Sequence, residues 1–179
     1  MQLDFLKTNE IPRIVSVMMQ YLGIKEIPGK ESNPVIIEMA RRLGIDKIYT
    51  NDDTAWCAVF GGYCLLIAEK PLPKFKDKYD YMRAKSYMSY GNPVKVGDER
   101  IGDIAIFHRP GGFHFAVIIA ETKNNFIVIG GNQNNSVNIT EIPKYKLYGA
   151  RRYYKNGLPK YAVKYVLNSE GKPINTNLA

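Results

Sequence analysis

The spacing of apolar residues in the first half of the chain predicts helices. Between residues 10 and 22, apolar side chains recur at close to helical spacing, and Gly23 can end that helix. The loop sequence EIPGKESNP follows, and then a second amphipathic segment, VIIEMARRL (residues 35–43). Pro34 stands near its start and Gly44 just past its end. We therefore expect two short helices joined by a loop.

The next run, AWCAVFGGYCLLIAEK (residues 55–70), is apolar almost all round, which predicts a central helix buried on most sides. One of the three polar residues 52–54 can cap its N-terminus. Gly61 and Gly62 each cost about 1 kcal/mol relative to alanine inside a helix. We expect a neighbouring element to pack closely against them.

In the second half the hydrophobic period changes to two, which indicates strands. The candidate strands are GDIAIFHR, FHFAVIIAE, NNFIVIGG, SVNITEI and YGARRYY, with turn sequences such as RPGG and TKNN between them. Before them, residues 81–91 read as a short helix on the rim. Helices followed by an antiparallel meander predict an α+β fold, with a sheet of about five to six strands.

The domain organisation follows from length and pattern. A chain of 179 residues fits one globular domain with a single core, which we place at residues 1–154. Residues 155–179 form a C-terminal extension with one added strand candidate, YAVKYVL, and a loose polar tail.

Charge narrows the classes of partner. Lys and Arg number 25 against 17 Asp and Glu, so the formal net charge is +8 and the long-range field favours anionic partners. The basic residues are scattered, without a dense block or a recognisable nucleic-acid module, so we do not expect nucleic acid to be the partner. A basic domain that binds anionic surfaces or nucleic acid stays open as an alternative.

Targeting signals are missing from the sequence as written. No run approaches eighteen apolar residues, so we expect no membrane span. The N-terminal stretch MQLDFLKTNEIPRIV lacks the basic and apolar regions of a secretory signal. We expect synthesis in the cytoplasm, and any action outside it to depend on another route of export or release.

The two cysteines, Cys57 and Cys64, are seven residues apart in the predicted central helix. Their Cα atoms would lie about 10 Å apart, beyond the roughly 7 Å limit for a disulfide, so we expect both to be free. Together with His108 and His114 they match no usual zinc-ligand spacing. We expect no metal and no cofactor.

Cys57 is the candidate nucleophile. It lies in the first turn of the central helix, where unpaired N–H groups and the positive end of the helix dipole stabilise a thiolate. The alternative is a small buried apolar residue beside Trp56. Cys64, which is mid-helix among apolar neighbours, is expected in the core.

His114 is the candidate base. It follows the turn sequence PGGF at the start of a strand, where clefts form, although an isolated histidine is also often a core residue. His108 ends the preceding strand beside Arg109. It is expected to face solvent or to contact residues that support the site.

A third residue must orient the imidazole, and the turn sequence GGNQNN after the next strand offers one. Asn132 would lie on the strand adjoining that of His114. Gln133 and Asn134 are close alternatives, and the whole turn could serve only as a hairpin connection.

Five segments of the chain carry a resemblance to a known family: EIPGKESNPVI, NDDTAWCAVFGGYCL, IGDIAIFHRPGGFHFAVI, GGNQNNSVNIT and YGARR. In this order, over residues 14–152, they resemble a bacterial and phage-associated family related to the CHAP and NlpC-type peptidoglycan hydrolases. The resemblance implies a papain-like fold with Cys57 as nucleophile, His114 as base and Asn132 as the orienting residue. It also implies cleavage of amide bonds in murein, by an endopeptidase or amidase in an endolysin-like setting.

The substrate contacts expected on this reading are Trp56, Asp53 and Gln133. Asp53 and its neighbour Asp52 can grip a substrate amine, or serve only as helix caps. The expected partners are peptidoglycan fragments, and the protein is expected to be a monomer. A catalytically inactive relative that only binds the wall stays open as a second alternative.

Overall fold

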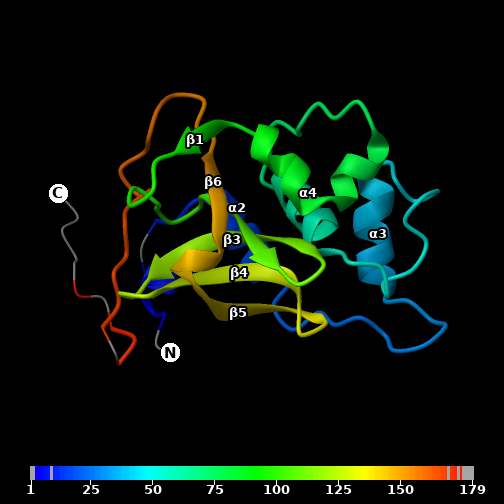
Figure 1. Ribbon diagram of the computed structural model, residues 1–179, viewed down its shortest axis with the longest axis horizontal. Helices are drawn as coiled ribbons and strands as arrows, with labels where there is room; N and C mark the ends of the chain where they lie inside the picture. Colours follow the sequence, from blue (N-terminus) through cyan, green and yellow to red (C-terminus); the bar gives the residue numbers. More distant parts are fainter. Residues whose placement is uncertain (1–2, 9, 169, 173, 175–179) are drawn as a thin grey trace.

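The computed structural model describes residues 3–8, 10–168, 170–172 and 174. Within them, the chain forms an α+β structure whose antiparallel sheet has six strands in the order β1-β6-β2-β3-β4-β5 (Figure 1). The strands are β1 (Asn92–Val94), β2 (Ile104–Arg109), β3 (Gly112–Glu121), β4 (Asn125–Gln133), β5 (Ser136–Pro143) and β6 (Leu147–Arg152). The helices are α1 (Phe5–Thr8), α2 (Arg13–Met19), α3 (Pro34–Arg42) and α4 (Cys57–Ile67), with 3-10 turns η1 (Lys78–Met82), η2 (Ala84–Ser89) and η3 (Lys144–Lys146).

Helices α2, α3 and α4 confirm the predictions made from apolar spacing, whereas α1 was not predicted. α2 falls inside the first amphipathic segment, and α3 begins one residue before the second, at Pro34. α4 is the buried central helix, with Cys57 as its first residue. Asn33 caps α3 by accepting a hydrogen bond from the N–H of Val35 at 2.9 Å, and Pro34 is its first residue. In the part of the chain described, no helix has the length and apolar character needed to cross a membrane.

The strands also follow the predicted segments, with three differences. β1 was not predicted, and residues 81–91 contribute to two 3-10 turns instead of one helix. Residues 161–167 form no regular strand, but Val166 makes an isolated parallel bridge with Glu121 while Tyr165 and Leu167 are buried. Of the predicted loose tail, residues 169, 173 and 175–179 lie outside the described residues.

α4 lies against β3 and β4, with α3 on its far side (Figure 1). A Cβ atom on Gly61 would lie 2.3 Å from the ring of Phe115 on β3, and one on Gly62 would lie 2.3 Å from the hydroxyl of Tyr87. The predicted close packing against both glycines is therefore confirmed.

The cap predicted for the central helix is wrong. The N-cap residue of α4 is Trp56, whose side chain makes no capping hydrogen bond. Asp52 is fully buried and accepts hydrogen bonds from the N–H groups of Ile27 at 3.0 Å and Asn33 at 2.7 Å. Asp52 lies too far before the helix start to cap it and holds the loop that precedes α3.

A buried ion pair ties β6 to the start of β2. Asp103, fully buried just before β2, accepts hydrogen bonds from Nε of Arg152 at 2.7 Å and Nη2 at 2.8 Å. The backbone N–H of Arg100 donates to the same carboxylate at 2.8 Å. Separating the two charges would leave a buried charge uncompensated, which is costly. The pair therefore holds β6 against the start of β2.

We predict that Gly61→Ala lowers the free energy of unfolding by about 1–2 kcal/mol. Overpacking against the fully buried ring of Phe115 costs about 1–3 kcal/mol, and this outweighs the gain of about 1 kcal/mol in helix propensity. Urea unfolding of the variant and the wild type measures the difference. Unchanged or higher stability of Gly61→Ala would contradict the close contact.

Candidate active site

The helix start presents Cys57 on the first turn of α4, where the N–H groups have no intrahelical partner and the helix dipole is positive. Its side chain is only 2% exposed. Trp56, just before it, is fully buried, and its indole N–H donates to the carboxylate of Glu26 at 3.0 Å. A Cβ on Gly131 of β4 would lie 2.6 Å from the Trp56 ring, so this ring packs the helix start directly onto the sheet.

His114 is the third residue of β3, paired across the hairpin with Phe107 of β2. Its side chain is buried, with Nε2 lying 3.0 Å from Oε1 of Gln133 at the end of β4. Gln133 is also buried. The structure therefore brings together His114 and one of the three residues considered as its orienting partner.

A hydrogen-bonded turn at the start of β5 holds the Gln133 amide in place. Its Nε2 donates to the backbone oxygen of Asn138 at 2.7 Å and to the side-chain oxygen of Asn138 at 3.0 Å. In return, the Asn138 amide donates to the backbone oxygen of Gln133 at 2.6 Å and to Oγ of Ser136 at 3.0 Å. These contacts allow the amide group of Gln133 only one orientation.

That orientation determines the tautomer of His114. A backbone carbonyl only accepts, so the amide nitrogen of Gln133 must face Asn138 and its oxygen must face the imidazole. An amide oxygen also only accepts, so Nε2 of His114 carries the hydrogen and donates it. In the neutral ring Nδ1 is then an unprotonated acceptor, the state that a general base requires.

Burial opposes ionisation of Cys57, yet the net effect of its surroundings is to lower its pKa below that of an ordinary thiol. Three neighbours outweigh the burial: the hydrogen bond and charge of His114, the backbone N–H of Phe115, and the charge of Arg109. Since Nε2 of His114 is bound to Gln133, Nδ1 is the ring atom left to face the sulfur.

The Phe115 N–H is free to contact the sulfur because of how β3 and β4 pair. Their register starts at the pair Val117 and Ile129, two residues beyond Phe115. The N–H of Phe115, which is not paired with β4, can therefore donate to the sulfur of Cys57.

Cys64 behaves differently. It is fully buried in α4, and burial raises its pKa well above the ordinary value. Both cysteines are free, as expected, and Cys64 lies in the core, as expected.

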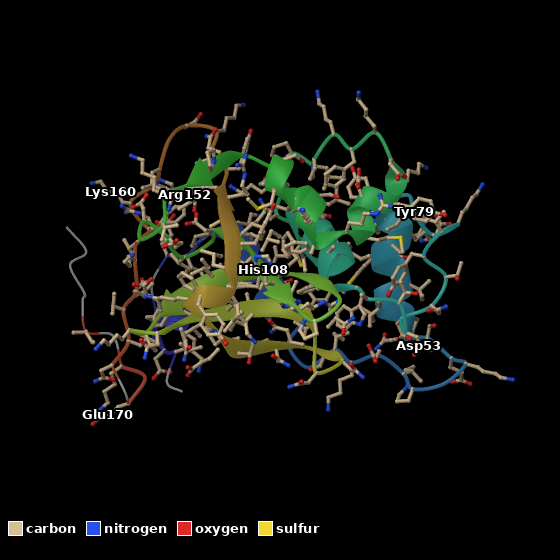
Figure 2. The ribbon with its side chains drawn as sticks, viewed as in Figure 1. Asp53, Tyr79, His108, Arg152, Lys160 and Glu170 are labelled. Carbon is tan, nitrogen blue, oxygen red and sulfur yellow. The ribbon has the colours of Figure 1, made fainter. Side chains whose placement is uncertain are left out.

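Three other candidate residues make no hydrogen bond to His114: Asn132, Asp53 and Asn134. Asn132 is partly exposed with a positive φ of 54°, and the ring hydrogen bond goes to its neighbour Gln133. Asp53 is exposed and lies far from His108 in Figure 2. His108 is exposed, as predicted, and Asn134 is exposed in the turn that follows β4.

Two participants were not singled out from the sequence. Asn138 lies inside an alternating strand pattern, where nothing marks it as the residue that holds Gln133. The backbone N–H of Phe115 has no signature in the sequence at all.

A cavity of about 230 Å³ lies beside His114 and Gln133, with Asn132, Arg109 and Lys146 also in its lining. A larger cavity of about 790 Å³ lies elsewhere, between residues 122–125 and the C-terminal segment, and contains neither His114 nor Cys57. The smaller cavity borders His114, whereas Cys57, which is 2% exposed, lines neither of the two cavities.

No protein-family model matches the chain, and no curated protein matches it. Across the described residues, no cluster of three or more His, Cys, Asp or Glu side chains is arranged to hold a metal ion.

We predict that iodoacetamide labels Cys57 and spares Cys64 in the folded protein, as read by peptide mass spectrometry. Because the pKa of Cys57 is lowered, its labelling should persist below the ordinary thiol pKa of about 8.5. His114→Ala should shift the profile to higher pH, since it removes the largest lowering contribution and leaves burial in place. Equal labelling of both cysteines would show that neither is activated.

We predict that Gln133→Ala slows this labelling about tenfold at neutral pH, while Asn132→Gly changes it little. The first variant removes the acceptor that orients the imidazole, a hydrogen bond worth about 1.5 kcal/mol or more when the ring is charged. The second is a matched control, because glycine tolerates the positive φ at this position. A larger loss in Asn132→Gly would return the orienting role to Asn132.

Proposed function

We propose that this protein is a cysteine-dependent hydrolase of papain-like type that cleaves amide bonds in the stem peptides of peptidoglycan. The observation that carries the proposal is the hydrogen-bonded chain from Asn138 through Gln133 to His114, next to a thiol whose pKa is lowered at a helix start. The substrate class comes from the motif resemblance, which spans residues 14–152.

In the first step the thiolate of Cys57 attacks the amide carbonyl carbon, and a carbon–sulfur bond forms. The N–H groups of the first turn of α4 are available to donate to the oxyanion. The carbon–nitrogen bond then breaks, and the imidazolium of His114 gives its proton to the leaving amine. The product is a thioester between the substrate acyl group and Cys57.

In the second step water attacks the thioester. His114, now neutral, takes a proton from this water at Nδ1 while Nε2 remains bound to Gln133. The carbon–sulfur bond breaks, and the carboxylic acid leaves with the oxygen of the water. The thiolate and imidazolium are restored, and no outside oxidant, reductant or metal is required.

The lowered pKa of Cys57 favours this enzyme over the two alternatives. A wall-binding relative without activity, or a basic domain that holds anionic polymers, gains nothing from burying a thiol beside an oriented imidazole. The net charge of +8 fits an anionic cell wall as the surface on which such an enzyme works. The setting we propose is endolysin-like, with the protein acting on the wall after release.

We predict that the purified protein releases peptides from bacterial sacculi and that Cys57→Ser lowers the rate by at least about a thousandfold. Cys64→Ala should keep the rate and lose about 1 kcal/mol of stability, as is usual for a small core truncation. Mass spectrometry of the fragments identifies the bond: new amino termini within stems mark an endopeptidase, and free lactyl groups mark an amidase. Equal release by the wild type and Cys57→Ser would refute the proposal.

A further inference from the structure

Three aromatic rings and a lysine form a surface group beside the candidate active site, which we call the ring cluster: Lys85, His108, Phe113 and Tyr148. The ring of Phe113 lies 4.8 Å from that of Tyr148 and 5.2 Å from that of His108, centroid to centroid. The rings of His108 and Tyr148 are also 5.2 Å apart. Nζ of Lys85 lies 5.1 Å from the ring centre of Phe113 and 5.2 Å from that of Tyr148.

The ring cluster adjoins the catalytic pair through the hairpin of β2 and β3. His108 and Phe113 are register partners, and the next pair along the hairpin is Phe107 and His114. Phe113 is two residues from Phe115, so both project from the face of β3 that packs on α4. The cluster therefore lies on the same side of the sheet as Cys57.

Lys85 lies on η2, and η2 is attached to α4 by a hydrogen bond. Tyr87, two residues after Lys85, donates its hydroxyl to the backbone oxygen of Ala58 at 3.0 Å, and Ala58 directly follows Cys57. The turn η2, which carries Lys85, is thus fastened to the first turn of α4.

The cluster is open to a ligand. Tyr148 is 42% exposed, His108 and Lys85 are exposed, and Phe113 is half-buried. Among the residues that the structure describes, no acidic side chain pairs with Lys85. Aromatic rings gathered into one partly exposed group indicate a contact site, since isolated exposed apolar residues need no such arrangement.

We propose that the ring cluster binds a sugar ring of the peptidoglycan glycan strand. A pyranose has an apolar face of C–H groups that can cover an aromatic ring, and hydroxyl and acetamido oxygens at its edge that accept hydrogen bonds from Lys85 and from the hydroxyl of Tyr148. A purely anionic polymer would need the lysine but not the rings, and a purely apolar partner would leave the ammonium unsolvated. The inference rests on the proposed function, because that function supplies the glycan.

The test uses the neutral oligomer chitotetraose as probe, titrated into Cys57→Ala protein and followed by two-dimensional NMR. We expect saturable shifts at the ring cluster, and a loss of affinity of about fivefold to tenfold when Tyr148→Ala is added. Tyr145→Ala is the matched control, since Tyr145 is 83% exposed on η3 and outside the cluster, and it should bind as before. Tyr148→Phe, which keeps the ring, should retain most of the affinity.

A second readout separates the two proposals. Tyr148→Ala with Cys57 intact should release peptides from sacculi about fivefold more slowly, while its iodoacetamide labelling rate stays at the wild-type value. Binding of chitotetraose by a protein that cleaves no sacculi would overturn the proposed function and keep the sugar site. Cleavage of sacculi with equal binding by Tyr148→Ala and Tyr145→Ala would overturn the sugar site alone. The sugar site would also be overturned if the protein bound an anionic wall polymer, lost that binding at high salt and did not bind chitotetraose.

Discussion

The candidate site depends on the close approach of α4 to the sheet, which glycines make possible. Gly61 of α4 leaves room for the ring of Phe115, and Gly131 of β4 leaves room for the ring of Trp56. Each contact lies next to a group in the site, because Phe115 follows His114 and Trp56 precedes Cys57. The packing of the core therefore sets the distance between the helix start and the strand ends that hold the imidazole.

At that distance, electrostatic interactions determine how readily the thiol of Cys57 ionises. Burial alone would raise the pKa of Cys57, as it does for Cys64 seven residues further along the same helix. The two cysteines share a helix and a buried environment, so the difference comes from polar neighbours present at one of them only. His114 is the main neighbour, and its effect relies on the Gln133 amide that holds the ring.

The sequence predicted α2, α3 and α4, most strands, and Cys57 at the start of a buried helix, because each depends on local hydrophobic period. It could not select the orienting residue. Unbroken alternation along β4 would place Asn132 on the face of His114, but the register with β5 shifts between Gly130 and Gln133, and this bulge brings Gln133 to that face instead. The predicted cap of α4 was wrong for a related reason. Asp52 accepts hydrogen bonds from a loop that is distant in sequence, and the sequence pattern does not show those contacts.

The most direct measurement of the central claim is the tautomer of His114, read from the ring nitrogen shifts in long-range ¹⁵N–¹H spectra. Cys57→Ala protein at a pH where the imidazole is neutral isolates the effect of the strand network from that of the thiolate. The hydrogen bond to Gln133 predicts the proton on Nε2, with Nδ1 unprotonated toward the position of the sulfur. A proton on Nδ1, or a mixture that Gln133→Ala leaves unchanged, would contradict the account.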